Sequence, residues 1–565
     1  MMSASKLQES GDVRIEHSLN TNEKEFVAKR RETVFQSLQK LKIHCSQTKV
    51  PNIALLGSGG GQRAMVGLLG SLVELDKAGL LDCILYLSGV SGSTWCMASL
   101  YQEPDWSTKL DTVKDKIIKR LSGPGVSCEN AYAKLKNYHK KDNFSLTDVW
   151  AAMAITTYVK EIDELTLTDH WDHLSKDPFP IYTVIDKHCK QEKKRGDPWF
   201  EISPYEAGYS ITGAFVGTSS FGSRFHENCR RKKTQDEMDM LYLQALCGSV
   251  LADREEICKF LWEKINDFFK NLTSTIERDA FEEMKKDPKN QVQKTAVFKC
   301  YQVLMDLVDM NLCVLNRKDP SELIESIIKT LKEHSGGKGH LSFPVEKTNF
   351  AEKQAAKLFV NIFTEQVCKD LNWFCSETLG LCKRILTCMA SWIWGRNYNF
   401  LHKIKDKSVP STLLENETRD YEDAGLLLNS PYFSVLRKER DIDLIISLDF
   451  SESHPFKTVT ETRELCEELN IFPEVSIPTE DLNKPKDFYV FKGKNVPTVI
   501  HIPLFNVVNC GDKVEKFRKK YGTFQRPYSR KMISELMEVA GQNILNNKDK
   551  LREQISEAVR KKRLD

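Results

Sequence analysis

Residues 51–100 restrict the fold of this chain more than any other segment. They begin with a run typical of a buried strand, Ile53-Ala54-Leu55-Leu56, which leads into a glycine cluster and then a helical pattern over residues 63–77. A second strand pattern at residues 84–87 is followed by another small-residue turn and a helix that begins near Thr94. Consecutive strands joined by a helix pair in parallel, so this segment predicts an α/β sheet.

The rest of the chain indicates that this sheet is split in sequence. Residues 227–343 are mostly charged helical sequence, with a glycine-rich stretch at residues 334–340 that is typical of a flexible linker. Residues 441–450 then form a clear strand pattern. We therefore expect an α/β fold with a mixed central sheet and flanking helices, interrupted by a helical cap or lid. The expected organisation is a leading amphipathic helix within residues 1–45 and one large domain over residues 46–565, with residues 227–343 as a variable insertion.

Composition excludes several classes of protein. Apolar residues make up 41% of the chain and charged residues 28%, which suits a globular domain with a sizeable core. Lys and Arg number 82 against 79 Asp and Glu, so no general positive field favours nucleic acid as a partner. The 16 cysteines are scattered singly, as in a reduced cytosolic protein. The N-terminal sequence has no signal-peptide pattern, and no window of about 18 apolar residues predicts a transmembrane helix.

The glycine cluster Gly57-Ser58-Gly59-Gly60-Gly61 is the first candidate for chemistry. It lies between the end of a strand and the start of a helix, where backbone N–H groups and the helix dipole favour an anion or a developing oxyanion. No Walker motif is present, so ATP or GTP binding is not expected. A dinucleotide loop stays open, because Gly59, Gly61 and Ala64 satisfy the form G-x-G-x-x-A. A tight turn without a ligand is the simplest alternative.

The second candidate is Gly89-Val90-Ser91-Gly92-Ser93, at the turn from the second strand into the next helix. It has the shape of a nucleophile elbow, G-x-S-x-G, with Ser93 in the final small position. Such a turn projects its central serine, here Ser91, into open space. The same pattern occurs by chance in loops of serine and glycine, but the glycine cluster one strand upstream strengthens the interpretation of Ser91 as a nucleophile.

A serine nucleophile needs a base, and the residues leave its identity open. None of the twelve histidines lies in a motif that marks a catalytic triad, so a Ser-His-Asp arrangement is neither supported nor excluded. Asp423, in Asp423-Ala424-Gly425, is the alternative, because its small neighbours let another backbone approach the carboxylate. By itself this motif is also typical of an aspartate in a turn.

Together these motifs resemble the cytosolic phospholipase A2 (group IV) family, and within it the calcium-independent gamma form most. The similarity runs from roughly residue 42 to Asn506, with the central charged region poorly matched. Gln62 departs from the family, in which this position is often apolar. The segments that carry the resemblance are residues 57–64, residues 89–95, residues 144–150, Trp199-Phe200-Glu201, residues 207–225, Asn399-Phe400-Leu401-His402, Asp423-Ala424-Gly425-Leu426, residues 444–450 and Pro503-Leu504-Phe505-Asn506.

The resemblance implies a hydrolase that works through a Ser/Asp dyad. In that scheme Ser91 is the nucleophile, Asp423 is its general base, Gly60 and Gly61 donate to the oxyanion, and Arg63 binds the phosphate of the substrate. The implied substrates are glycerophospholipids and lysophospholipids, whose acyl esters are cleaved through an acyl-serine intermediate, with transacylation as a side reaction. Neither a cofactor nor a metal is expected.

Two other functions stay open beside this one. The first is a dinucleotide-binding oxidoreductase, which rests on Gly59, Gly61 and Ala64. The second is a lipid-binding protein that keeps the fold but lacks activity. Labelling of Ser91 by a serine-directed reagent separates the hydrolase from both.

The resemblance also implies that the protein approaches membranes without calcium. The chain before Gly57 is too short for a calcium-binding C2 domain, so none is expected. Residues 379–394 place Trp392 and Trp394 near Lys383 and Arg384, a composition that suits a membrane interface, although a buried helix is the favoured interpretation.

The basic end of the chain, Arg560-Lys561-Lys562-Arg563, has the same two interpretations. It would attract anionic lipid, but a helix end in solvent is favoured. The chain carries neither a prenylation box nor a myristoylation site. We therefore expect a cytoplasmic protein that associates reversibly with membranes.

Overall fold

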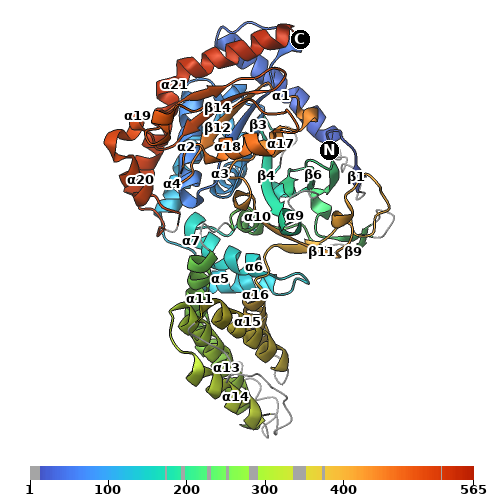
Figure 1. Cartoon of the computed structure of the whole chain (residues 1–565), viewed down its shortest axis with the longest axis vertical. Coiled ribbons are helices and arrows are strands. Elements are labelled where there is room, and N and C mark those ends of the chain that lie inside the picture. The colour runs from blue at the N-terminus through green and yellow to red at the C-terminus, as the bar shows by residue number, and fades with distance from the viewer. Residues whose placement is uncertain are drawn as a thin grey trace, which may run out of the picture. The chain divides into compact units, whose positions relative to one another are not determined.

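The computed structural model divides the chain into two compact units, whose elements are labelled in Figure 1. It describes residues 13–171, 175–191, 197–225, 231–233, 235–249, 254–278, 291–334, 352–371, 376–452, 454–523 and 525–564. The first unit comprises Met1–Ser127, Ala154–Val250 and Gly395–Asp565, and the second comprises Cys128–Met153 and Leu251–Trp394.

The first unit is built on a mixed sheet of twelve strands within the described residues. Its centre is parallel, in the order β4-β3-β2-β12-β14, and its outer strands pair antiparallel. The central strands are β4 (Phe179–Asp186), β3 (Tyr86–Gly89), β2 (Ile53–Gly57), β12 (Leu444–Asp449) and β14 (Thr498–Pro503). The outer strands are β1 (Arg14–Ile15), β7 (Ala214–Gly217), β6 (Glu206–Tyr209), β5 (Trp199–Ile202), β13 (Tyr489–Phe491), β10 (Arg396–Tyr398) and β11 (Thr418–Asp423). The prediction of an α/β fold whose core resumes late in the chain is therefore confirmed.

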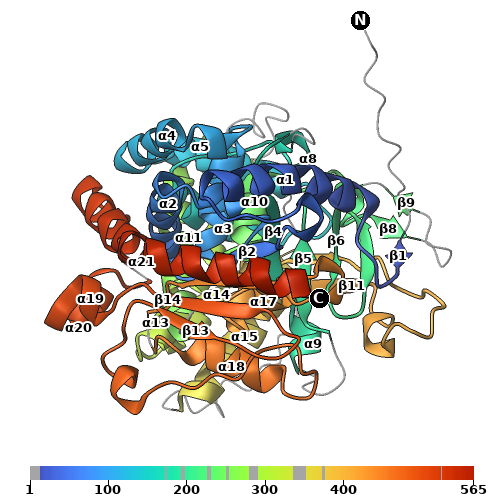
Figure 2. The same cartoon turned by 90° about the horizontal axis from the view of Figure 1, so that it is seen from above.

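Helices cover both faces of this sheet, as Figure 2 shows. The helices α2 (Gly61–Lys77) and α3 (Gly92–Tyr101) follow β2 and β3 and contact each other on one face. Helix α18 (Lys457–Leu465) follows β12 and lies on the other face. After β2 the chain crosses to one face of the sheet, and after the neighbouring strand β12 it crosses to the opposite face. In α/β sheets this switch point, at the carboxyl ends of the strands, is where ligands bind.

Helix α2 is held closely against the C-terminal helix α21 (Arg530–Leu564). A Cβ built on Gly70 would lie 2.6 Å from the backbone oxygen of Met537, and one built on Gly541 would lie 2.7 Å from Cγ of Glu74. Glycines at both positions let the two helices approach each other. Close packing against α21 therefore fixes the position of α2, the helix that begins in the glycine cluster.

The leading helix α1 (Thr21–Lys40) lies where the sequence predicts an amphipathic helix. The side chain of Asn20 caps its first turn by accepting from the N–H of Asn22 at 2.8 Å. The helix stops before Lys42, whose φ of 60° cannot continue it. Residues 1–12 of the predicted leading segment lie outside the described residues.

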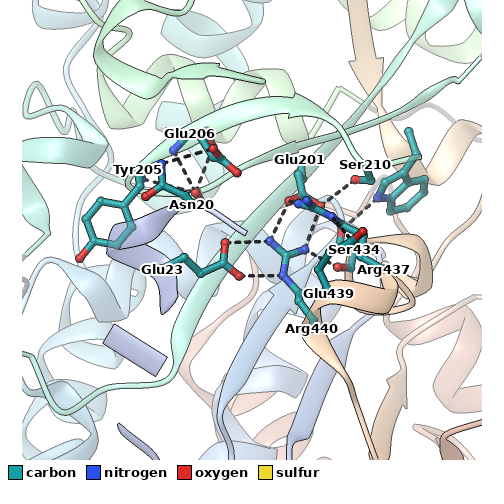
Figure 3. Close-up of polar contacts among 12 residues, drawn as sticks. Asn20, Glu23, Glu201, Tyr205, Glu206, Ser210, Ser434, Arg437, Glu439 and Arg440 are labelled. Atoms are coloured by element: carbon teal, nitrogen blue, oxygen red, sulfur yellow. Dashed lines mark hydrogen bonds and ion pairs between the residues drawn. The ribbon is translucent and has the colours of Figure 1, made fainter. Parts of the chain in front are cut away.

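A buried cluster of charges joins α1 to the sheet (Figure 3). The guanidinium of Arg440 donates to Glu23 of α1 and to Glu201 of β5 at 2.7–3.2 Å, and all three side chains are buried. Arg437 donates to the same Glu201 at 2.8 Å. Because charges in low dielectric are costly alone, this cluster must stay assembled for the fold to be stable. Amphipathic periodicity alone places Glu23 in solvent, so the sequence did not reveal it.

The second unit is helical within the described residues. Its helices are α5 (Cys128–Tyr138), α6 (Leu146–Trp150), α11 (Arg254–Asn271), α13 (Gln291–Leu315), α14 (Ser321–His334), α15 (Lys353–Asp370) and α16 (Glu377–Ser391). It therefore includes residues 344–394, beyond the predicted insertion, whereas α10 (Met240–Cys247) contacts α3, β4 and β11 of the first unit. The predicted linker after His334 lies outside the described residues.

Helix α16 corresponds to the segment with an interfacial composition. Its apolar side chains are buried, and Trp394 packs edge to face on Trp150, with 6.2 Å between ring centroids. Arg384 donates to three backbone carbonyls beyond the end of α5, those of His139, Lys141 and Asp142. The buried-helix interpretation therefore holds for the helical part of the segment, up to Ser391, whereas Trp392 and Ile393 follow the helix and are half-buried. Among the described helices, none is both long and apolar enough to cross a bilayer.

Candidate active site

Ser91 lies on the sharp turn that the sequence predicts between β3 and α3. Its φ of 52° and ψ of −123° lie in a region that residues other than glycine rarely adopt. This conformation costs on the order of 1–3 kcal/mol, so the packing around the turn must enforce it. Ser91 is 5% exposed. A strained serine between a strand and a helix is the geometry of a nucleophile elbow.

The glycine cluster lies directly against this elbow. A Cβ built on Gly92 would lie 1.8 Å from the backbone oxygen of Gly61, so no side chain fits between the two segments. A Cβ built on Gly59 would lie 3.0 Å from Cβ of Ser91. Glycine is thus required at both positions by close approach. The serine and the glycine cluster share one site.

The backbone of this cluster presents unpaired donors at the start of α2. Gly60 and Gly61 have φ values of 154° and 55°. Within the described parts of the chain, the N–H groups of Gly60, Gly61 and Gly92 donate to no protein acceptor. Gly59 differs, because its N–H donates to the backbone oxygen of Asn429 at 3.0 Å. Three N–H groups close to Ser91 are thus left for an oxyanion.

Asp423 reaches the same place through its strand. It ends β11 opposite Val184 of β4, while Gly89 ends β3 opposite Tyr182 of β4. Val184 pairs with Phe200 of β5 along one edge of β4. Asp423 must therefore pair with Val184 along the other edge, beyond the point where β3 ends. The carboxyl ends of β3 and β11 therefore meet along one edge, two residues or roughly 7 Å apart along β4.

Further contacts tie Asp423 to both motifs. The thiol of Cys247 is close to Asp423 and to Thr94 of α3, and burial, with a smaller contribution from the Asp423 charge, raises its pKa. Six residues beyond Asp423, Asn429 donates to the backbone oxygen of Gly59 at 3.2 Å. The elbow, the glycine cluster and the segment from Asp423 to Asn429 therefore converge.

Asp423 itself is buried, with 0% of its surface exposed. Its Oδ1 accepts from the N–H of Gly425 at 2.8 Å, which fixes the carboxylate at the end of β11. Among the described residues, the hydroxyl of Ser91 makes no hydrogen bond, to a histidine or to Asp423. Catalytic hydrogen bonds are often long before substrate binds, so Asp423 stays a candidate base for Ser91.

Arg63 lies beneath the glycine cluster rather than on the surface. It is 1% exposed, and its Nε and Nη1 donate to the backbone oxygens of Phe450 and Tyr521. Glu452, 3.7 Å from Nη1, is its nearest carboxylate. A Cβ built on Gly60 would lie 3.0 Å from Nη2 of Arg63, so this nitrogen faces the cluster. Burial lowers the pKa of Arg63, and nearby acidic groups only partly oppose this.

Sequence reasoning missed several parts of this site. The amide of Asn429 carries no motif that marks it, and the N–H of Gly92 was not identified as a donor although it lies within the elbow motif. The segment around Tyr521 and Tyr528, which contacts Arg63, comes about a hundred residues after Asp423 and has no signature of its own. The G-x-S-x-G pattern was the one available signal, because the residue after such a serine usually donates to the oxyanion.

The basic end of the chain is not part of this site. Lys562 pairs with Asp441 and Asp443 at 3.0 and 2.6 Å, Lys561 donates to the oxygen of Val496, and Arg563 donates to that of His44. These contacts engage Lys561, Lys562 and Arg563 within the protein, while Arg560 is exposed. They favour a helix end that packs on its own unit over a lipid-binding tail.

Comparisons with known proteins indicate the family of this chain. Residues 53–293 match the family described as "Lysophospholipase catalytic domain". The chain is 34% identical to cytosolic phospholipase A2 gamma of Mus musculus, covering 94% of this chain and 90% of that protein. It is 31% identical to the Homo sapiens protein of the same name, covering 96% and 95% of the two chains.

Solved structures share the fold. Human GIVD cytosolic phospholipase A2 aligns with a TM-score of 0.64 at 21% identity, over 98% of this chain and 69% of the other. The same human protein in complex with methyl gamma-linolenyl fluorophosphonate aligns with a TM-score of 0.62 at 19% identity, over 98% and 67%. The family match and the two relatives exclude the dinucleotide-binding alternative. The chain belongs to the cytosolic phospholipase A2 family of hydrolases.

Proposed function

We propose that this protein hydrolyses acyl esters of glycerophospholipids and lysophospholipids with Ser91 as the nucleophile. One observation carries the proposal: Ser91 is held in a strained turn directly against a glycine cluster whose N–H groups have no protein acceptor in the described part of the chain. A nucleophile next to preorganised donors is what ester hydrolysis requires.

In the proposed reaction, the Oγ of Ser91 attacks the acyl carbonyl carbon while the Asp423 carboxylate takes the serine proton. The N–H groups of Gly60 and Gly61, with that of Gly92, bind the oxygen that becomes negative. Collapse of this intermediate breaks the ester bond, and the leaving alcohol or lysophospholipid takes the proton from Asp423. Water then attacks the acyl-serine, gives its proton to Asp423 and releases the fatty acid. The serine regains its proton from Asp423.

The surroundings of Asp423 support its role as the base. Its carboxylate is fully buried, and the N–H of Gly425 holds it in place at 2.8 Å. Its place at the end of β11, beside the end of β3, brings it toward the elbow. Arg63 is proposed to stabilise the substrate phosphate through Nη2, the guanidinium nitrogen that faces the glycine cluster.

Labelling with a fluorophosphonate tests the nucleophile. The wild-type protein is expected to be labelled at Ser91 and to release fatty acid, whereas Ser91→Ala abolishes both. Ser99→Ala is the matched control, because Ser99 lies on the same helix and donates to the backbone oxygen of Trp95. Asp423→Asn is expected to lower turnover by about 10⁴-fold, since the proton then has no acceptor. Near-normal turnover of Asp423→Asn would instead direct the search to a histidine.

Product analysis tests the finer features of the proposal. Phospholipids labelled differently in each acyl chain distinguish phospholipase from lysophospholipase activity, and added lysophospholipid reveals transacylation when it accepts the acyl group. By similarity to the gamma form, we expect no dependence on calcium, so activity in excess chelator should equal that in added calcium. A catalytically inactive lipid-binding protein would bind liposomes but release no fatty acid.

We further propose that the protein is cytoplasmic, associates reversibly with membranes, and uses its helical insertion (residues 227–343) as a cap. Co-sedimentation with liposomes that is reversed by dilution tests the membrane association. Deletion of residues 254–334, which keeps α10 and its contacts with α3, tests the cap, because activity toward micelles and toward a water-soluble ester should then respond differently.

A further inference from the structure

Gln62 makes two hydrogen bonds from a buried side chain. It is the second residue of α2, directly after Gly61, and is 3% exposed. Its Oε1 accepts from the N–H of Tyr528 at 2.8 Å, and its Nε2 donates to the backbone oxygen of Tyr158 at 3.3 Å. The amide thus joins two distant segments at the foot of the glycine cluster.

On one side, Gln62 and Arg63 hold the same segment. Arg63 donates to the oxygen of Tyr521, and the hydroxyl of Tyr528 donates to that same oxygen at 3.2 Å. Gln62 accepts from the N–H of Tyr528, which closes a ring of contacts. Two consecutive residues of α2 are therefore fixed to one C-terminal segment. This restrains the first turn of α2, where Gly60 and Gly61 present their N–H groups.

On the other side, Gln62 connects the glycine cluster with the helix that follows the nucleophile. The ring of Tyr158 stacks on that of Trp95, with 6.0 Å between centroids and 18° between planes. Trp95 lies on α3, four residues after Ser91, and its indole N–H donates to the backbone oxygen of Gln244 at 3.0 Å. The contacts of Gln62 therefore reach both halves of the proposed site.

We propose that Gln62 is a positioning residue that sets the oxyanion donors against Ser91. This inference rests on the proposed function. Oxyanion donors act only when held within about 0.5 Å of the productive geometry, and the residues around them supply that precision. An apolar side chain at position 62 fills the same space but fixes neither Tyr528 nor Tyr158.

The first test is Gln62→Leu, which keeps the volume and removes both hydrogen bonds. Loss of one oxyanion donor typically lowers kcat by 10²–10³-fold, so misplaced donors are expected to lower it by about 10–100-fold. KM should change less than threefold, because the substrate is still bound. The rate of fluorophosphonate labelling at Ser91 should fall with kcat, since the phosphonyl oxygen needs the same donors.

The second variant, Gln62→Glu, makes the result independent of folding defects. When protonated, the carboxyl group introduced by this substitution accepts from Tyr528 and donates to Tyr158, as the amide does, whereas the ionised carboxylate can only accept and repels the oxygen of Tyr158. The ratio of the variant kcat to the wild-type kcat should therefore rise at least fivefold between about pH 8 and about pH 5.5. A residue with only a structural role would give a constant ratio.

The control is Gln554→Leu, which removes another buried amide of the same unit, on α21. It should leave kcat and the labelling rate unchanged. A kcat for Gln62→Leu within twofold of wild type, or a pH-independent ratio for Gln62→Glu, would overturn the inference while leaving the proposed function intact. A wild-type protein that is neither labelled nor active would overturn the proposed function, and the inference with it.

Discussion

Arg440 and Arg63 are both buried arginines, but the groups around their charges differ. Arg440 contacts the carboxylates of Glu23 and Glu201. Burial by itself would lower its pKa, yet the two carboxylates raise the pKa of Arg440 well above its usual value. Arg63 contacts two backbone oxygens and only the half-exposed Glu452, 45% of whose side chain is exposed, so burial lowers its pKa.

This difference supports the proposed roles, a structural charge at Arg440 and a functional one at Arg63. The charge of Arg440 is fully compensated within the protein, so a further anion would gain little there. The charge of Arg63 is under-compensated and lies beneath a glycine cluster with unpaired N–H groups. An anion at that cluster, whether phosphate or a developing oxyanion, is attracted by a charge that the fold compensates only in part.

The largest effect is expected for Arg440→Met. Removing the cation leaves Glu23 and Glu201 buried without their partner, which should lower the free energy of unfolding by about 3–5 kcal/mol. Denaturant unfolding measures this, and kcat per folded molecule should be unchanged. The control is Arg463→Met, which breaks an exposed pair with Glu474 and should lower the free energy of unfolding far less, because water screens the two charges. Equal losses in the two variants would contradict the structural role of Arg440.

Arg63→Lys should show the opposite balance. An ammonium group cannot serve both backbone oxygens and the glycine cluster, so kcat/KM for a lysophospholipid is expected to fall by about 10²–10³-fold. The free energy of unfolding should fall by only about 1–3 kcal/mol, from the carbonyls left unpaired. Steady-state kinetics beside denaturant unfolding provide the comparison. A variant that is fully active once folded would show that Arg63, like Arg440, is only structural.

Acid should weaken the Arg440 cluster through Glu201. Burial by itself would raise the pKa of this carboxyl, but Arg440 and Arg437 lower the pKa of Glu201 from 4.5 to about 2. A carboxyl group whose pKa is lower in the folded protein than in the unfolded chain stabilises the fold at pH values above the unfolded-chain pKa. This contribution is lost as the pH falls toward the pKa in the folded protein. The free energy of unfolding should therefore decrease below about pH 4.5, with a shallower slope for Glu201→Gln. Parallel slopes from urea titrations between about pH 5 and about pH 3 would contradict this.

The smallest effect is expected for Glu452→Gln. This substitution removes the carboxylate nearest Arg63 while its amide oxygen still accepts from Thr523. Binding of a substrate phosphate should improve by about 0.2–1 kcal/mol, because the charge of Arg63 is then less compensated. KM for a lysophospholipid is expected to fall up to about fivefold, and less at high salt. A rise in KM would indicate that the phosphate does not approach Arg63.

The strands and helices around the site were predictable because their signals are local. Strand β2 and helix α2 begin within two residues of the predicted positions, since the apolar run and the glycines act on the chain next to them. The second strand starts at Tyr86 instead of Ile84, because Leu81–Cys83 forms a 3₁₀ turn that ends at Ile84. Apolar periodicity does not detect such a turn, so the predicted start of this strand was two residues too early.

The buried charges were not predictable in the same way. Glu23 and Arg440 lie more than four hundred residues apart in sequence, and each has the local pattern of a solvent-exposed residue. Gln62 is similar, because its partners come from residues 158 and 528. Such pairs form only when the chain packs, since a hydrogen bond replaces the water that each group would otherwise keep.

The sequence by itself determined the α/β core, the strained turn at Ser91 and the glycine cluster, because backbone sterics and apolar periodicity act over a few residues. Tertiary structure alone decided that Asp423 ends its strand beside β3, that Arg63 is buried without a buried counter-ion, and that Gln62 joins three segments. These features depend on strand register and on desolvation. Both are properties of the assembled sheet, in which groups hundreds of residues apart exchange contacts with water for contacts with one another.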